Sequence, residues 1–438
     1  MQTTEEISQL LIRNMKGEVL QKFENYIMVL VRDPLFKNAI KCNRMTDRVE
    51  IVKPVGWHRM GTALTDIDLR YMRFYMEKYY GLSNPSTIEE AVELVANEQG
   101  FHPVCEMLEE LQWDGVERIK ELLPVYMGVP RDEYAYEVMK LFLLGSIHRV
   151  YEPGCKFDYI LCLVGGQGAG KSTFFRFLAI KDELFSDDLK KLNDENVYRK
   201  MQGHWILEMS EMISIGTAQS TDEVKSFLSR QKETYKDPYD KFVRDRLRQC
   251  TFGGTTNRMD FLPLDRTGNR RFLPVLVDMD NAEKHILGDE KESREYILQV
   301  WAEAMVIYKS GDYKLDFPQH LQEQLLAIQK ECMPDDSVAG RVQVYLDEFK
   351  GDYVCSLQLY QEALKNNDKP NQKELRELND IMNNSVIGWK KCNGQKRLGI
   401  YGQQRAWERE QKLESVNGVS SSGDGFEPVG EQMEIPFP

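Results

Sequence analysis

One glycine-rich stretch constrains the fold of this 438-residue chain more than any other feature. It reads Gly165-Gly166-Gln167-Gly168-Ala169-Gly170-Lys171-Ser172 and matches the pattern G-x-x-x-x-G-K-[ST] at every fixed position. The apolar run 159–164 before it predicts a buried strand, and residues 173–179 after it predict the first turns of a helix. Strand, glycine loop and helix in this order predict a phosphate-binding loop in an α/β fold.

The residue types of this loop suit a nucleoside triphosphate. Glycines allow backbone N–H groups and the helix N-terminus to face an anion. We expect Lys171 to reach the β- and γ-phosphates and the Ser172 hydroxyl to ligate Mg²⁺. The sequence therefore predicts ATP and Mg²⁺ as cofactors. The predicted ATP-binding residues are Gly165, Gly166, Gln167, Gly168, Ala169, Gly170, Lys171, Ser172 and Thr173.

Two later segments end in polar residues that suit hydrolysis of the bound nucleotide. The apolar run 204–207 leads into Glu208 and Glu211, as a buried strand does when it delivers acids to the edge of a sheet. We expect Glu208 to hold Mg²⁺ and Glu211 to polarise the attacking water, although the two roles could be exchanged. Asn257, at the end of segment 250–257, is expected between the γ-phosphate and that water. The alternatives are ordinary surface glutamates and a turn residue.

Adjacent arginines, Arg270 and Arg271, follow a tight turn and precede an apolar strand. This position suits an arginine finger, which reaches the γ-phosphate of a neighbouring subunit and stabilises charge in the transition state. The alternative is an exposed pair that forms salt bridges.

Charge is distributed unevenly along the chain. The whole chain carries a net charge of −13, but residues 225–248 contain eight basic and four acidic residues. Aromatic residues alternate with basic ones there, which combines stacking faces with phosphate partners. We expect Lys236, Tyr239, Lys241 and Arg244 to contact DNA. The alternative is a solvated charged loop.

The chain divides into several regions by composition and pattern. There is no run of 18 apolar residues, no signal peptide and no C-x-x-C pair among the eight cysteines, which favours a cytoplasmic protein without a membrane segment. An Asn393-Gly394 turn predicts a C-terminal hairpin after three helices, typical of a winged helix. The predicted regions are an N-terminal α+β region (1–97), a helical region (98–153), the α/β ATPase core (154–335), a winged-helix-like domain (336–404) and a disordered acidic tail (405–438).

With these segments in this order, the chain resembles the virulence-associated protein E family of phages and mobile genetic elements. That family belongs to the superfamily-three branch of AAA+ helicases. The resemblance covers about residues 99–404 and includes segments 111–118, 153–158 and 234–239, besides the motifs above. It implies an α/β P-loop NTPase core of the AAA+ type, with a mainly helical N-terminal region and a C-terminal winged-helix-like domain.

The resemblance also implies a function. It implies an ATP-dependent replicative DNA helicase that forms a ring-shaped homo-oligomer, expected to be a hexamer, and acts on single-stranded and forked DNA in the bacterial host cytoplasm. A hairpin within 225–248 is expected to project into the ring channel. About 97 residues precede the match, so a separate primase is expected as a partner. The tail 426–438 resembles the tip of bacterial single-stranded DNA-binding proteins, which suggests a host replication partner. The alternatives are an ATP-regulated origin-binding initiator and a DNA packaging or transfer motor.

Overall fold

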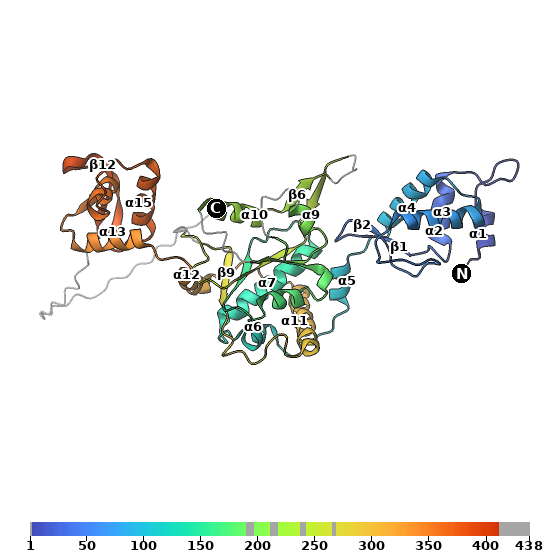
Figure 1. Ribbon diagram of the computed structural model, residues 1–438, viewed down its shortest axis with the longest axis horizontal. Coiled ribbons are helices and arrows are strands. Elements are labelled where there is room, and N and C mark those ends of the chain that lie inside the picture. Colours follow the sequence, from blue (N-terminus) through green and yellow to red (C-terminus); the bar gives the residue numbers. More distant parts are fainter. Residues whose placement is uncertain (1, 190–196, 211–217, 237–241, 265–268, 411–438) are drawn as a thin grey trace, which may run out of the picture. The chain divides into compact units, whose positions relative to one another are not determined.

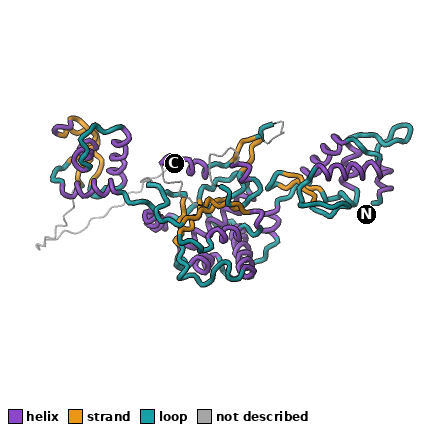
Figure 2. Tube along the Cα trace, in the orientation of Figure 1, coloured by secondary structure: helices purple, strands orange, loops and turns teal. Residues whose placement is uncertain are grey.

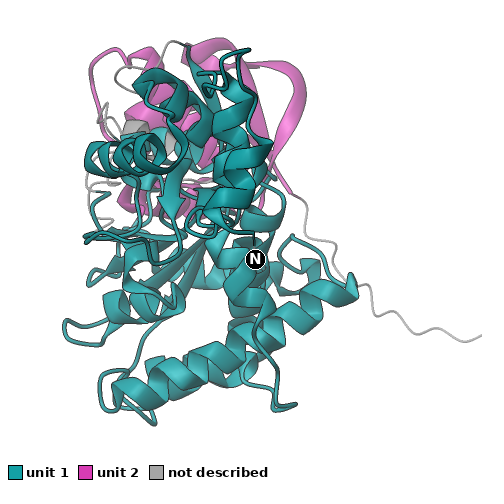
Figure 3. Cartoon of the chain, turned by 90° about the vertical axis from the view of Figure 1, so that its right-hand side faces the viewer, with its two compact units in different colours: residues 1–335 teal, residues 336–438 magenta. Residues whose placement is uncertain are grey.

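The computed structural model describes residues 2–189, 197–210, 218–236, 242–264 and 269–410. The chain forms two compact units, Met1–Asp335 and Asp336–Pro438 (Figure 3). Each unit has a hydrophobic core of its own. Within the described residues, no helix combines the length and the apolar character that a bilayer span requires.

The N-terminal region of the first unit is a small α+β assembly. Its elements are α1 (Thr4–Leu10), α2 (Phe23–Arg32), β1 (Ile40–Asn43), β2 (Arg48–Ile51), α3 (Asp66–Tyr80) and α4 (Pro85–Glu98). Strands β1 and β2 pair antiparallel around a turn at residues 44–47. Helix α3 ends at Gly81, whose φ of +71° suits glycine. Buried side chains of α2, α3 and α4 form a separate core, and the mixture of helices and strands agrees with the predicted α+β character of this region.

A central parallel sheet organises the rest of the first unit (Figure 2). It has five strands in the order β4-β5-β8-β3-β9, and every pairing within it is parallel. The strands are β3 (Ile160–Val164), β4 (Phe185–Ser186), β5 (Ile206–Ser210), β8 (Thr251–Thr256) and β9 (Phe272–Leu276). All five residues of β3 are buried, as expected for a central strand covered on both faces. The predicted parallel α/β core is therefore confirmed.

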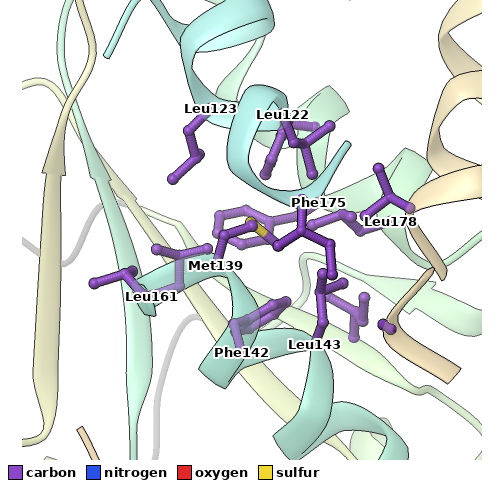
Figure 4. Packing of buried hydrophobic residues seen from close by; sticks show 14 of the residues in the cluster. Leu122, Leu123, Met139, Phe142, Leu143, Leu161, Phe175 and Leu178 are labelled. Carbon is purple, nitrogen blue, oxygen red and sulfur yellow. The ribbon is translucent and has the colours of Figure 1, made fainter. Parts of the chain in front are cut away.

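Helices cover the sheet. They are α5 (Pro103–Glu109), α6 (Ile119–Met127), α7 (Glu133–Tyr151), α8 (Lys171–Leu178), α9 (Val197–Met201), α10 (Ala218–Leu228), α11 (Glu290–Ser310) and α12 (Gln322–Glu331). The largest core joins α6, α7, β3 and α8, where Leu122, Phe142, Leu161 and Phe175 pack together (Figure 4). This core fixes the glycine loop, which connects β3 to α8, on a rigid base.

A two-stranded hairpin leaves the first unit between α10 and β8 (Figure 1). Strand β6 (Lys232–Tyr235) pairs antiparallel with β7 (Arg244–Leu247), and Tyr235 lies opposite Arg244. The buried Arg248 forms an ion pair with Glu233 at the base of the hairpin. The predicted hairpin within 225–248 is thus confirmed, with residues 237–241 outside the described part of the chain.

The second unit alternates helices and strands. Its elements are α13 (Ser337–Glu348), β10 (Tyr353–Cys355), α14 (Ser356–Gln358), the π-helical turn η4 (Leu359–Ala363), α15 (Gln372–Asn384), β11 (Trp389–Leu398) and β12 (Gly402–Arg409). The sheet order is β10-β12-β11, with both pairings antiparallel.

Two sequence predictions for this unit were wrong. Asn393-Gly394 does not form the hairpin turn: it lies inside β11, where the register shifts between Lys391 and Gln395, and the turn is at Gly399–Tyr401. Gly394, with φ of +92°, serves a bulge because pairing with β12 overrides the local turn preference. The tail does not begin at residue 405, since β12 runs to Arg409 and buries Trp407.

Candidate functional site

The glycine loop follows β3 and ends at the first turn of α8, as predicted. Gly168 and Gly170 have φ of +85° and +75°, which only glycine adopts without strain. A Cβ on Gly170 would lie 2.6 Å from Cγ2 of Ile286, and one on Gly165 would lie 2.8 Å from Cβ of Val277. The loop therefore needs glycine both for its backbone and for its close packing against the segment after β9.

Lys171 is held inside the loop. Its side chain is buried, and Nζ donates to the carbonyl oxygens of Gly165 and Gly166, both at 2.7 Å, and to Oδ1 of Asn257 at 2.9 Å. Burial lowers the pKa of Lys171, and nearby Glu208 opposes that shift. The ammonium thus has neutral oxygen partners, which a phosphate oxygen can replace with a stronger, charged one.

Glu208 lies on β5 and is fully buried. Its Oε1 accepts hydrogen bonds from Oγ of Ser172 at 2.7 Å and from Oγ1 of Thr255 at 2.5 Å. Burial raises the pKa of Glu208, and the bonds from Thr255 and Ser172 oppose this. Its Oε2 is buried and has no hydrogen-bond partner among the described residues. A buried carboxylate oxygen of this kind needs a cation or a donor to satisfy it.

The pair Ser172 and Glu208 fits Mg²⁺ on that observation. Mg²⁺ usually takes one or two protein oxygens and completes its shell with waters and substrate phosphates. Among the described residues there is no group of three or more His, Cys, Asp or Glu side chains arranged for a metal ion. Waters and the phosphates of a bound nucleotide could supply further oxygen ligands to a cation here.

These side chains meet because three parallel strands end at one edge of the sheet. Val164 of β3 pairs with Thr256 of β8, so the loop and Asn257 begin side by side. Ser210 of β5 pairs with Thr255 in the same layer. Carboxyl edges of parallel sheets are where ligands bind in α/β folds. The structure brings Lys171, Ser172, Glu208 and Asn257 together, and Glu211 lies outside the described residues.

The two arginines lie at the opposite edge of the sheet. Arg271 Nε donates to Oδ2 of Asp158 at 3.0 Å, and Arg270 Nη2 is 4.0 Å from the same oxygen. Asp158 precedes β3 by two residues, whereas the glycine loop follows it. Five residues of strand, at about 3.3 Å each, separate these edges by roughly 15 Å. Arg270, with a 70% exposed side chain, faces solvent and lies far from the loop of its own chain.

The predicted DNA-contact residues lie on the hairpin. Lys236 follows β6 and is exposed, and Arg244 begins β7 with a 58% exposed side chain. Tyr239 and Lys241 fall outside the described residues. Phe242 and Val243, next to Arg244, are also exposed, so apolar and basic groups share this end of the hairpin.

Sequence reasoning missed two residues of the nucleotide region. Thr255, one of the two donors to Glu208, lies in segment 250–257, where the sequence predicted a role for Asn257 alone. His285 accepts from the backbone N–H of Leu287 through Nδ1 at 3.2 Å, so its Nε2 carries the proton and donates to the carbonyl of Gly168 at 3.1 Å. No motif signals His285, because it follows the loop by more than a hundred residues.

Comparison with known proteins gives a family. The sequence model of the virulence-associated protein E-like domain matches residues 108–334, which is just over half of the chain. No curated protein matches the chain. Among solved structures, the apo NrS-1 C-terminal region is similar at 13% identity, covering 84% of this chain and 96% of that chain, with a TM-score of 0.46. The JCV helicase is similar at 13% identity, covering 63% of this chain and 84% of that chain, with a TM-score of 0.26.

The family match spans the glycine loop, Glu208, the hairpin and the arginine pair. Its limits enclose the sheet and most of the helices that pack on it. The chain belongs to the virulence-associated protein E family.

Proposed function

We propose that this protein is an ATP-driven replicative helicase that unwinds the DNA of a phage or mobile genetic element. The observation that carries the proposal is the cluster at the carboxyl edge of the sheet. Lys171 there bonds Asn257, and Ser172 and Thr255 bond a buried Glu208. This combination of a phosphate loop, a buried acid and a polar side chain suits hydrolysis of a nucleoside triphosphate.

Each residue of the cluster has a role in hydrolysis. Backbone N–H groups of residues 165–173 bind the phosphates, and Lys171 moves its ammonium from the loop carbonyls to the β- and γ-phosphates. Ser172 and Glu208 would hold Mg²⁺, which would supply positive charge to offset that of the phosphates. Asn257 orients the attacking water, and Glu211 accepts its proton, unless Glu208 takes that role.

Arg270 acts on the nucleotide of a neighbouring subunit. Its distance from its own loop and its exposure support a role in trans. Arg271 is the second candidate, because its Nε already donates hydrogen bonds to Asp158 and Ser229 within its own subunit. A subunit that supplies its arginine to the next one requires a ring, for which we propose a hexamer.

DNA binding is assigned to the hairpin and to the second unit. Lys236, Tyr239, Lys241 and Arg244 offer phosphate partners and a stacking face to single-stranded DNA. We assign a winged-helix fold to the second unit, supported by its element order and by the sheet order β10-β12-β11. Residues 389–409 of that unit contain six basic residues and one acidic residue, which suits DNA backbone contact.

The family suggests where this activity takes place and which partners it needs. The helicase would work in the cytoplasm of a bacterial host, with a separate primase to supply primers. A host replication protein that binds the tail 426–438 would complete the partners. An ATP-regulated origin-binding initiator, or a DNA packaging or transfer motor, is the other function that the same cluster could serve.

Strand separation of a forked substrate tests the proposal. We expect unwinding with ATP and none with a non-hydrolysable analogue, because translocation needs turnover. Lys171→Ala should abolish both ATPase activity and unwinding, since the variant lacks the ammonium that contacts the β- and γ-phosphates. Lys181→Ala, which removes an exposed lysine beyond α8, is the matched control and should behave as wild type. Hydrolysis without any unwinding would favour the initiator.

A further inference from the structure

A cleft lies at the base of the hairpin, and no residue of the glycine loop lines it. It consists of two adjoining cavities of about 480 and 630 Å³, which share Asp47, Gln202, His204 and Arg246. Cavities of this size can hold a ligand as large as a nucleotide. Its walls come from the turn between β1 and β2, from α9 and the residues after it, and from β7.

One wall is basic. Arg48, Arg199 and Arg246 line the larger cavity from three different elements, and Asp47 is the one acid among the described residues that line it. Thr46 Oγ1 and His204 Nδ1 are buried there and have no hydrogen-bond partner among the described residues. Unpartnered buried polar atoms cost free energy, so a ligand that supplies partners is favoured. Three guanidinium groups make an anion the natural ligand.

The other wall is aromatic. Tyr198 and Tyr235 line the smaller cavity, and their rings stack with centroids 6.1 Å apart and an interplanar angle of 16°. The guanidinium of Arg246 lies 5.1 Å from the ring centroid of Tyr235. Aromatic faces beside arginines form the usual binding surface for single-stranded nucleic acid, with bases on the rings and phosphates on the cations.

We propose that this cleft binds single-stranded DNA, with backbone phosphates against Arg48, Arg199 and Arg246 and a base beside Tyr198 and Tyr235. The inference rests on the proposed function, because it takes DNA as the polymer that the protein binds. It goes further by assigning DNA contacts to the N-terminal region, through Thr46 and Arg48. Strand β7 forms part of the cleft and begins at Arg244, so the cleft extends the contact surface from the hairpin toward the turn at 44–47.

In the proposed complex, the Asp47 carboxylate occupies the position beside the arginines that a DNA phosphate would take. Its Oδ2 lies 2.8 Å from Nη1 of Arg246 and 3.8 Å from Nη1 of Arg244. Incoming DNA must displace this carboxylate before it can pair with the same arginines. Asp47 has φ of +56°, a left-handed conformation that asparagine adopts readily. Asp47→Asn therefore removes the competing charge and leaves the backbone of the turn unchanged.

Two neighbouring substitutions should thus have opposite effects. Binding of a fluorescent oligothymidylate to the full-length protein is measured by anisotropy over a series of salt concentrations. Arg48→Ala should weaken binding about fivefold at 0.1 M salt and reduce the salt slope by about 0.7, as loss of one phosphate contact does. Asp47→Asn should tighten binding by about the same factor. Arg70→Ala, an exposed arginine on α3 outside the cleft, is the control and should match wild type.

Photocrosslinking provides a second measurement. An oligonucleotide containing bromouracil should crosslink to peptides that contain Tyr198 or Tyr235. The cleft assignment is overturned if wild type binds single-stranded DNA but Arg48→Ala and Asp47→Asn both bind like Arg70→Ala and crosslinks come from elsewhere. The assignment is also overturned if these two substitutions change the affinity for duplex DNA but not the affinity for single-stranded DNA. A wild-type protein that hydrolyses ATP but binds no single-stranded DNA would overturn the proposed function too, so the two failures are distinguishable.

Discussion

Glu208 illustrates what a single residue reveals in sequence and in structure. The apolar run before it predicted that it belongs to a buried strand, and it does lie on β5. Its two hydroxyl donors differ in how readily they can be predicted from the sequence. Ser172 belongs to a recognised motif, whereas Thr255 is a threonine in a strand, where threonine is common for packing reasons. The bond from Thr255 to Glu208 depends on the alignment of β5 with β8, which only the folded sheet provides.

Removal of the Thr255 hydroxyl should therefore impair hydrolysis. Thr255→Val keeps the shape of the side chain but leaves the buried Glu208 with one donor fewer, a loss of about 1–3 kcal/mol. If that loss is carried into the transition state, the ATPase rate falls about tenfold to a hundredfold. Thr255→Ser retains the hydroxyl and should restore most of the rate. Steady-state ATPase assays on both variants check this, and equal rates would show that the hydroxyl does not support Glu208.

Helix α3 shows how far sequence predicts an element. The helix lies within the region predicted to be α+β and occupies Asp66–Tyr80. A capping box between Thr65 and Asp68 begins it, a pattern that is readable locally. The other partners of Asp68 are not local. Nε1 of Trp57 donates to it at 2.7 Å and Nε of Arg59 at 2.8 Å, which ties the loop before the helix to its first turn.

Asp68 makes the stability of this region depend on pH. Burial raises the pKa of Asp68, but bonds from Arg59, Trp57 and Thr65 outweigh it and lower the pKa to about 2 from 3.8. Because the folded pKa is depressed, Asp68 contributes stability that is complete near pH 7 and is lost as the pH falls from about 4 to about 2. The shift corresponds to about 2 kcal/mol.

Asp68→Asn should therefore destabilise α3 by about 2 kcal/mol at pH 7, and the difference from wild type should shrink below pH 4. Hydrogen exchange of peptides from α3, corrected for intrinsic rates, measures this difference across the pH series. Asp66→Asn is the control, since Asp66 lies in the same first turn but is exposed. Equal protection in Asp68→Asn and Asp66→Asn at pH 7 would contradict the expectation.

Pairing between strands set the limits of prediction for other elements. The strand before the glycine loop and the parallel sheet were predictable, since β3 is a continuous apolar run. The position of the C-terminal hairpin turn was not predictable. Asn393-Gly394 favours a turn locally, but extended pairing of β11 with β12 keeps this dipeptide within the strand. The end of β12 was missed for the same reason: Trp407 is buried by partners that precede it in sequence.

At the scale of the whole molecule, the sheet separates two sets of charged residues. Lys171 and Glu208 belong to the carboxyl edge, and Arg270 and Arg271 to the amino edge beside Asp158. The sequence placed Glu208 after an apolar run and the arginines before one. The parallel alignment of β3 with β9, which the sequence does not give, puts the two sets at opposite edges of one sheet. The two edges are separated by about 15 Å of strand, so in the proposed trans arrangement the phosphate loop of one subunit uses the arginine of a neighbour. Two subunits in head-to-tail contact would complete the site.

Mixing of subunits tests this arrangement. Arg270→Ala should bind ATP but turn it over about a thousandfold more slowly, and Lys171→Ala should lose binding at its own loop. Neither variant alone should show appreciable ATPase activity. In an equimolar mixture, about a quarter of the interfaces join an intact loop to an intact arginine, so ATPase activity should reappear. Arg271→Ala, mixed in the same way, tests the second candidate. If the mixture stays inactive and Arg270→Ala binds ATP as poorly as Lys171→Ala, Arg270 serves its own subunit's structure and not a neighbour's nucleotide.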